Sequence, residues 1–270
     1  MLGSSRAAVT AGRDALAAAL HSGVDWNQLA EELFAVTAAV DGNAALRRAL
    51  VDPSREGAPK RQLVTRLFSG KVSTATAHVL ETLVSQRWSR DRDLADTVEN
   101  LGVEAVVACA EAGERLDAVE DELFRFGRLV AGTPDLRRAV NEQQASTEAR
   151  ADLVERLLEG RTAPETVRLV RHAVVAPRGR RFDRIVEGYL SVIARRREQL
   201  TATVFTARAL ESSQRERLAR ALARIYDRMI QVNVVVDPDV LGGLRIHVGD
   251  EVIDGTILRR LDEARRQLAG

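Results

Sequence analysis

Apolar residues recur every three to four positions through most of the first two hundred residues, the spacing that places them on one face of an amphipathic helix. Gly42 and Gly70 are typical of helix ends, and Asp25 and Ser73 are typical N-caps, because their side-chain oxygens accept free backbone N–H groups. The pattern predicts helices over 5–20, 25–40, 44–50, 59–70, 74–87 and 91–112, and a long one over 184–200.

The same pattern returns ninety residues later. Residues 46–49 and 136–139 are both Leu-Arg-Arg-Ala, and the alignment that superposes them also pairs Phe34 with Phe124. Turn residues match as well as core residues, so we predict two similar bundles in tandem, with the two phenylalanines at equivalent core positions. The helix over 91–112 is expected to end the first bundle and begin the second, which makes the joint stiff.

After residue 200 the apolar period shortens to two, which is typical of strands. Strands are expected over 201–207 and 232–236, with a helix from 213 to about 229 between them. Leu244, Ile246 and Val248 alternate with Arg245 and His247, so this strand has an apolar face and a polar face on which His247 is solvated.

The end of the chain predicts a hairpin and a last helix. Gly249-Asp250 forms a two-residue hairpin loop with glycine at its first central position. Asp254 is placed to cap the helix that follows. The C-terminal seventy residues therefore read as strand, helix, three strands and helix.

This last stretch also carries a family resemblance. Gly242-Gly243-Leu244-Arg245-Ile246, then Val248-Gly249-Asp250, then Val252-Ile253-Asp254-Gly255 with Arg259 and Leu261, resemble the C-terminal signature of the delta subunit of F-type ATP synthases, the counterpart of the mitochondrial oligomycin-sensitivity-conferring protein. The resemblance extends upstream to Val204 and is looser over the helices. Most members are shorter, and the tandem bundle explains the extra length as the actinobacterial form with a duplicated helical domain.

The resemblance implies a mainly α fold with a small C-terminal α/β domain. The expected domains are 1–105 and 106–199, the two bundles, and 200–270. The implied function is that of a non-catalytic peripheral-stalk, or stator, subunit of a proton-translocating ATP synthase. It would connect the N-terminal helices of the alpha subunits, at the top of the catalytic headpiece, to the C-terminal ends of the membrane-anchored b subunits. The implied location is the cytoplasmic face of the bacterial membrane, reached only through these partners.

Two sets of residues are candidates for these contacts. The alpha-binding candidates are apolar residues of the first and fifth helices: Val9, Leu16, Val79, Leu80, Leu83 and Val84. The alternative is that these apolar stripes are simply buried in the bundle. The candidates for b-subunit binding, or for shaping the C-terminal domain, are the signature residues Gly242, Gly243, Arg245, Asp250, Asp254 and Gly255.

Composition argues against several other functions and locations. The formal net charge is +1, so no global field gathers nucleic acid or acidic membranes. Cys109 is the single cysteine, which excludes an internal disulfide and is expected to be a small core residue. No signal peptide and no run long enough to span a bilayer is recognisable, so we expect a soluble, intracellular protein.

The sequence contains no motif that indicates catalytic residues, a cofactor or a metal site. The stretch around Gly70 and Lys71 lacks the first glycine and the hydroxyl of a phosphate loop. The four histidines are too far apart in sequence for a recognisable metal site.

An arginine-rich segment over 178–197 leaves a second function open. Arg178, Arg180, Arg181 and Arg184 precede a further run of three arginines at 195–197. A solvated helix face or a contact with an acidic protein explains them, and the alternative function is a helical regulatory protein that binds nucleic acid here. No helix of a kind that reads nucleic-acid bases is recognisable in this segment, which disfavours nucleic acid.

Overall fold

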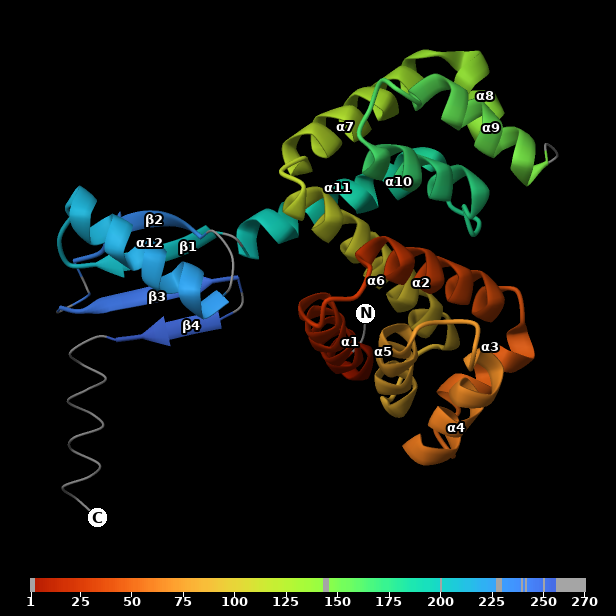
Figure 1. The fold of residues 1–270 in the computed structure, drawn as a ribbon, viewed down its shortest axis with the longest axis horizontal. Coiled ribbons are helices and arrows are strands. Elements are labelled where there is room, and N and C mark those ends of the chain that lie inside the picture. The colour runs from red at the N-terminus through yellow and green to blue at the C-terminus, as the bar shows by residue number, and fades with distance from the viewer. Residues whose placement is uncertain are drawn as a thin grey trace. The chain divides into compact units, whose positions relative to one another are not determined.

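The computed structural model describes residues 3–142, 146–199, 201–226, 230–238, 240, 242–249 and 251–255. Its helices are followed by a small sheet with one helix (Figure 1), which confirms the predicted fold class. The chain divides into two compact units, Met1–Val192 and Ile193–Gly270. The three-domain boundaries expected from the sequence stay a prediction.

The first unit begins with a bundle of six helices. They are α1 (Gly3–His21), α2 (Trp26–Asp41), α3 (Ala44–Val51), α4 (Gly57–Phe68), α5 (Thr74–Ser85) and α6 (Asp91–Ala112). Asp25 caps α2 by accepting the backbone N–H groups of Asn27 and Gln28, and Ser73 caps α5 by accepting that of Thr76, as predicted.

Five more helices follow, the last of which crosses the boundary between the two units at Val192. They are α7 (Leu116–Gly132), α8 (Pro134–Asn141), α9 (Thr147–Leu158), α10 (Pro164–Val175) and α11 (Phe182–Gln199). The helices α8, α9 and α10 begin and end ninety residues after α3, α4 and α5. The glycine that ends each α4-type helix has the same left-handed backbone, with φ +72° at Gly70 and +69° at Gly160, which a side chain would strain.

Tertiary contacts repeat at the same offset. Glu32 of α2 accepts hydrogen bonds from the Ser73 backbone N–H at 2.9 Å and from the Thr76 hydroxyl at 2.5 Å, at the start of α5. In the second copy, Glu122 accepts equivalent bonds from Ala163 at 3.0 Å and Thr166 at 2.5 Å. The repeat seen in the sequence is therefore a repeat of helix packing as well as of helix lengths.

Helix α6 belongs to both copies. It follows α5 as the last helix of the first copy, and it stands ninety residues after α1, where the first helix of the second copy is expected. Fifteen of its 22 residues are buried, because α1, α2 and α3 pack on it as well as α7 and α10. Cys109 is among the buried residues, and burial raises the pKa of its thiol, as expected of a core cysteine.

The second unit contains a four-stranded sheet. Its strands are β1 (Thr201–Thr206), β2 (Gln231–Val236), β3 (Leu244–Val248) and β4 (Glu251–Asp254), in the order β2-β1-β3-β4. Strands β1 and β2 are parallel and are joined through α12 (Ser212–Tyr226), whereas β3 pairs antiparallel with β1 and β4. The predicted hairpin is present, with φ +57° at Gly249. The predicted final helix lies outside the described residues.

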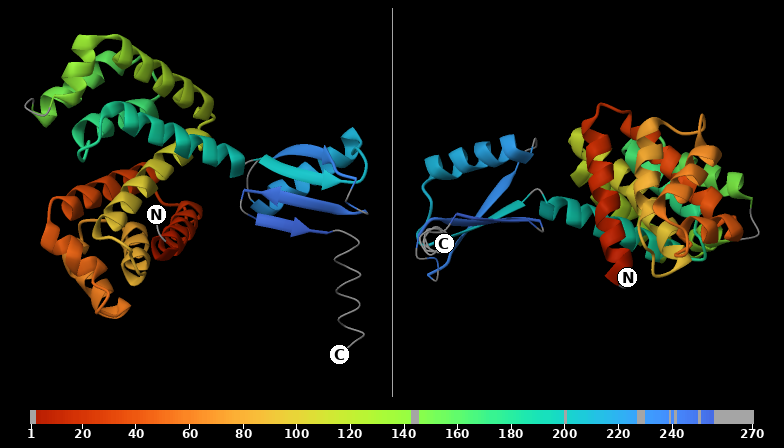
Figure 2. Two further views of the ribbon diagram at one scale, coloured as in Figure 1. Left: turned by 180° about the vertical axis from the view of Figure 1, so that it is seen from behind. Right: turned by 90° about the horizontal axis from the view of Figure 1, so that it is seen from below.

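One face of this sheet is covered by α12 (Figure 2). Ala202, Val204, Ile246 and Val248 point to that face and form a core with Leu222 of α12. Alternation along β1 and β3 therefore sets which residues are buried, as the sequence pattern predicts.

Candidate interaction surfaces

Most of the apolar residues proposed to bind a partner lie inside the first bundle. The residues that are at most 3% exposed are Leu16, Val79, Leu80, Leu83 and Val84. Only Val9 is half-buried. The alternative interpretation of the stripes is therefore right for these five side chains, which fill the core between α1, α5 and α6. That the α1–α5 pair binds a partner stays a prediction, and such contact has to use the surface beside them.

The outer surface of α1 has two flanks. Ser5 donates a hydrogen bond to Asp93 at 2.7 Å and Arg13 pairs with Glu104 at 2.9 Å, so this flank faces α6. Val9 lies between them on the same flank, one turn from Arg13. The helical period places the small residues Ala7, Ala11 and Ala18 on the opposite flank, toward α5. Those three side chains are exposed or half-buried, so this flank of α1 is accessible.

The second copy has no such open flank. The residues of α6 that stand ninety positions after Ala7, Ala11 and Ala18 are Thr97, Leu101 and Ala108, and each is at most 1% exposed. The first copy itself covers them, because α6 is its last helix. The two copies therefore repeat a fold and differ in the surface that each leaves accessible.

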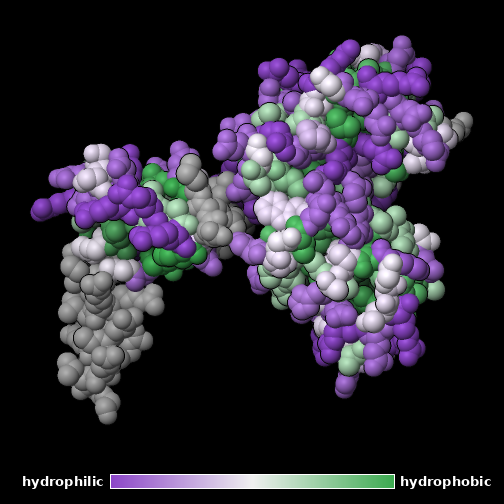
Figure 3. Space-filling view, in the orientation of Figure 1, coloured by the Kyte–Doolittle hydropathy of each residue, from purple (hydrophilic) through white to green (hydrophobic). Residues whose placement is uncertain are grey.

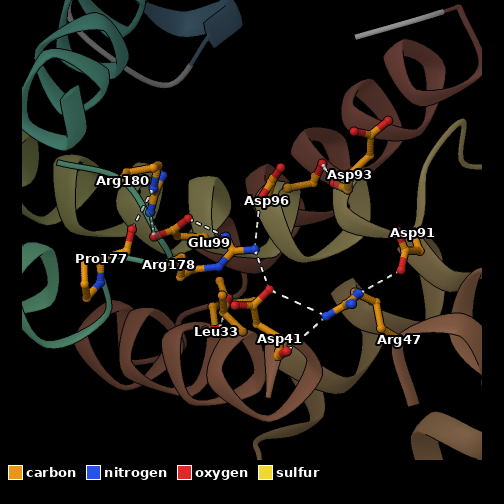
Figure 4. Close-up of polar contacts among 12 residues, drawn as sticks. Leu33, Asp41, Arg47, Asp91, Asp93, Asp96, Glu99, Pro177, Arg178 and Arg180 are labelled. Atoms are coloured by element: carbon orange, nitrogen blue, oxygen red, sulfur yellow. Dashed lines mark hydrogen bonds and ion pairs between the residues drawn. The ribbon is translucent and has the colours of Figure 1, made fainter. Parts of the chain in front are cut away.

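A buried ion-pair cluster joins the two copies (Figure 4). At its centre is Glu99 of α6, only 2% exposed, which accepts contacts from His172 of α10 at 3.2 Å, from Arg178 at 2.7 Å and from Arg180 at 2.5 Å. Arg178 also reaches Asp41 at the end of α2, at 3.1 Å. The cluster therefore ties α2 and α6 to the loop that follows α10.

Backbone conformation directs Arg178 into this cluster. Arg178 has φ +52° and its neighbour Gly179 has φ +75°, so two consecutive residues are left-handed. This conformation costs an arginine about 1 kcal/mol or more. Ion pairs to Glu99, Asp41 and Asp96, the last at 2.8 Å, offset that strain.

The cluster keeps Glu99 ionised. Burial alone would raise the pKa of this carboxyl group, but the hydrogen bond with His172 and the charges of Arg180 and Arg178 outweigh it and lower the pKa to about 2. No local sequence pattern could identify Glu99, since its partners His172 and Arg178 lie more than seventy residues away along the chain.

The arginine-rich segment is therefore largely engaged within the protein. Arg178 and Arg180 bind Glu99, Arg181 pairs with Asp183 and Arg184 pairs with Glu187. These ion pairs give the arginines a role within the fold. The nucleic-acid hypothesis rested on these arginines and is therefore not supported.

The prediction for the two phenylalanines is wrong for Phe124. Phe34 is 7% exposed and stacks on His172 of the second copy with ring centroids 3.8 Å apart, whereas Phe124 is 56% exposed. The difference arises because the copies pack head to tail. The second copy covers Phe34, and the described chain has no third copy to cover Phe124.

The signature residues of the second unit shape its sheet. Gly242 and Gly243 have φ +135° and +82°, which only glycine adopts readily. The N–H of Gly255 donates to the Leu244 carbonyl at 2.9 Å and closes the far end of the hairpin. Asp254 ends β4 opposite Arg245, and Asp250 and the helix that Asp254 was expected to cap lie outside the described residues.

The sheet face opposite α12 carries mixed side chains. Arg245 pairs with Asp237 at 3.1 Å and lies over the Phe205 ring, 5.3 Å from its centroid. The ring centroid of His247 lies 5.0 Å from that of Phe205 and the residue is half-buried, so the histidine predicted to be solvated is only partly exposed. Beside it, Val252 is 54% exposed.

We expect Gly243→Val to destabilise the second unit by about 1–2 kcal/mol, because valine at φ +82° pays the steric cost of a left-handed backbone. Two measurements on the full-length chain test this: the midpoint of thermal unfolding, and the hydrogen-exchange protection of the β3 amides. Protection in β3 equal to that of the unmodified chain would show that the signature glycine is not needed for its conformation.

Two kinds of site are absent from the described residues. No group of three or more histidine, cysteine, aspartate or glutamate side chains could hold a metal ion. No described helix is long and apolar enough to cross a membrane.

Comparison with known proteins identifies relatives over nearly the whole chain. The family model "ATP synthase delta (OSCP) subunit" matches residues 14–101 and 103–268, two stretches that meet inside α6. A protein called ATP synthase subunit delta from Kineococcus radiotolerans is 52% identical over 92% of this chain and 90% of its own. The protein of the same name from Streptomyces avermitilis is 45% identical over 99% of this chain and 98% of its own. A chain of the mitochondrial ATP synthase hexamer of Toxoplasma gondii aligns at 17% identity over 62% of this chain and 95% of that chain, with a TM-score of 0.31, too low to establish a common fold.

Proposed function

Because the chain belongs to the ATP synthase delta (OSCP) subunit family, and so is a peripheral-stalk component of an ATP synthase, we propose that its first bundle binds the alpha subunits and its C-terminal unit binds the b subunits. The alpha contact is with the N-terminal helices at the top of the catalytic headpiece, and the b contact is with the C-terminal ends. The complex lies at the cytoplasmic face of the bacterial membrane, which the chain reaches through its partners.

The observation that carries the proposal is the unequal exposure of two equivalent helices. A partner helix that packs between α1 and α5 needs small side chains at the contact so that the backbones approach closely. Ala7, Ala11 and Ala18 supply them on α1, whereas the equivalent residues of α6 are buried. The first copy is therefore the one that offers this flank to an alpha subunit.

A single substitution on α1 tests this assignment. We expect Ala11→Arg to weaken binding of a peptide of the alpha subunit's N-terminal helix at least tenfold, because the long charged side chain fills the flank toward α5. Ala17→Arg is the matched control: Ala17 is also exposed on α1, and the helical period places it away from that flank. Isothermal titration calorimetry compares the two. Equal affinities would place the alpha contact elsewhere.

The tryptophans provide a second readout. The indole N–H of Trp26 donates to the Leu20 carbonyl at the end of α1, and that of Trp88 donates to the Leu83 carbonyl of α5, both at 2.9 Å. A helix that docks between α1 and α5 changes the surroundings of these rings, and residues 106–199 contain no tryptophan. We expect the emission maximum to shift on binding. A peptide that binds calorimetrically without a shift would point to the second copy.

Truncation separates the two partners. We expect a chain of residues 1–200 to keep its affinity for the alpha peptide, since Met1–Val192 is a compact unit, and to lose its affinity for the C-terminal end of the b subunit. Calorimetric titration of the truncated and full-length chains with each partner is the measurement. Loss of alpha binding by a folded 1–200 chain would overturn the assignment of that contact to the helices.

A further inference from the structure

The second copy contains a pocket with an unusual lining. It has a volume of about 400 Å³ and lies where α8, the start of α9, the end of α10 and the loop before α11 meet. The lining includes Arg137, Arg138, Arg150, Arg180 and Arg181 and no acidic residue among the described ones. In the view of Figure 3 the surface over α8 and α9 is mostly hydrophilic.

Arg150 is the deepest of these arginines. Its side chain belongs to a residue only 8% exposed, and its Nε–H has no hydrogen-bond partner. A buried donor without a partner costs about 1–3 kcal/mol, and more when the group is charged. The pocket gives this guanidinium group access to a ligand that enters from outside.

In the first copy, the buried basic residue at the equivalent position has a hydrogen-bond partner within the protein. The residue ninety positions before Arg150 is Lys60, which is also buried, and its ammonium group donates to the Gln86 carbonyl at the end of α5, at 3.4 Å. A basic residue is therefore retained at this position in both copies. It has a protein partner in the first copy and faces a pocket in the second.

A second difference between the copies increases the positive charge. Arg47 of the first copy donates to the Asp41 carbonyl at 3.0 Å and also pairs with Asp91 at 3.0 Å. Its equivalent, Arg137, keeps the matching bond to the Ala131 carbonyl at 3.0 Å, and position 181, ninety residues after Asp91, is an arginine. The loop that replaces the Asp91 region, residues 176–182, contains three arginines and no acid. The second copy has thus lost a neutralising carboxylate where it has gained arginines.

The charges in the lining do not cancel. Arg180 pairs with Glu99, Arg181 pairs with Asp183, and Arg138 makes a loose contact with exposed Asp135 at 3.6 Å. Those three carboxylates leave two of the five arginines, Arg137 and Arg150, for which the described residues provide no ion pair. The pocket therefore carries a net charge of about +2.

We propose that this pocket binds the phosphate group of a small molecule. A phosphate group carries a charge of about −1.5 to −2 near neutral pH, which matches the excess charge, and arginine is well suited to its oxygens because it offers several N–H donors in a fixed plane. The volume lies within the range of small-molecule sites, so a phosphate ester fits as well as inorganic phosphate. Pro134, Val140, Pro177 and Phe182 form an apolar wall for the remainder of such a ligand.

Calorimetric titration of the full-length chain tests the proposal. Inorganic phosphate and ADP serve as probes at constant ionic strength, with acetate as the control anion. We expect saturable binding at one site, competition between the two phosphate probes, and at least tenfold weaker binding of acetate. An ADP affinity above that of phosphate assigns the apolar wall to the rest of the ligand, and equal affinities assign the site to the phosphate group alone.

Two variants place the binding in this pocket. Arg150→Gln removes the buried guanidinium group. Arg138→Gln removes a guanidinium group from the rim of the pocket. The Arg138 side chain is 76% exposed, so this second substitution should not destabilise the fold. We expect each to weaken phosphate binding at least tenfold. Arg125→Gln, an exposed arginine of α7 that pairs with Asp121 outside the pocket, is the control and should change it less than twofold.

Several results would overturn the proposal. The proposal is wrong if neither phosphate probe gives a saturable heat of binding. It is also wrong if the Arg138→Gln and Arg125→Gln variants bind phosphate with equal affinity. Acetate, or a glutamate-rich peptide, binding as tightly as phosphate would show that the pocket receives carboxylates of a partner protein. None of these outcomes bears on binding of the alpha or b subunits, so the proposed function stands or falls separately.

Discussion

Glu99→Ala is expected to lower the free energy of unfolding of the helical unit by about 3–5 kcal/mol, the usual loss when one member of a buried ion-pair network is removed. Arg178 keeps Asp41 and Asp96, but it loses its contact with Glu99, and His172 and Arg180 lose their carboxylate partner. Urea denaturation monitored by circular dichroism measures the change. The matched control is Glu187→Ala, which breaks an exposed pair with Arg184 and should cost less than about 0.5 kcal/mol.

The same carboxyl group makes stability depend on pH. Its pKa is about 2 in the folded chain against a reference value of 4.5, so its contribution, about 3 kcal/mol, is fully present above pH 4.5. It is lost as the pH falls from 4.5 toward 2, because the unfolded chain then binds the proton more readily. We expect Glu99→Gln to flatten the fall in stability over this window. A fall as steep as in the unmodified chain would show that other carboxylates cause it.

Gly102→Val is expected to destabilise the helical unit by about 2–3 kcal/mol, because it overfills the place where α2 meets α6. A Cβ atom at Gly102 would lie 2.7 Å from Cε1 of Phe34. That ring cannot move freely, since it stacks on His172 at 3.8 Å. The better helix propensity of valine recovers only a fraction of the loss.

Another glycine within a helix provides the control for Gly102. Gly188 of α11 has no heavy atom within 4 Å of its Cβ position, so Gly188→Ala should stabilise the chain by up to about 1 kcal/mol through helix propensity alone. Denaturation midpoints of the two variants should therefore move in opposite directions. If Gly102→Val were as stable as Gly188→Ala, close contact between α2 and α6 would not explain the glycine.

Local patterns were sufficient to predict the elements. Asp25, Ser73 and Gly70 act as cap or stop residues because such signals depend on neighbours one turn away. Alternation in β3 likewise identified Ile246 and Val248 as core residues. The family resemblance rested on the same stretch, and the relatives that match nearly the whole chain confirm it.

The interaction surfaces were harder to predict, since they depend on which elements meet. The apolar stripe of α5 shows the limit: periodicity identifies Val79 and Leu83 as apolar neighbours but does not tell a core from a docking groove. Phe124 and Phe34 have the same local sequence, and only the head-to-tail order of the copies separates them. Glu99 and Arg178 are 79 positions apart, so no spacing rule could pair them.

The shared helix α6 has a mechanical consequence for a subunit of a stalk. With 22 residues it extends about 33 Å, and both copies are built on that one rod. Bending one copy against the other therefore has to strain consecutive backbone hydrogen bonds, whereas a loop of the same length would yield by rotating about single bonds. Duplication through a common helix lengthens the helical unit without inserting a flexible loop between the copies. A twisting force is therefore transmitted from one copy to the next with little deformation of the joint.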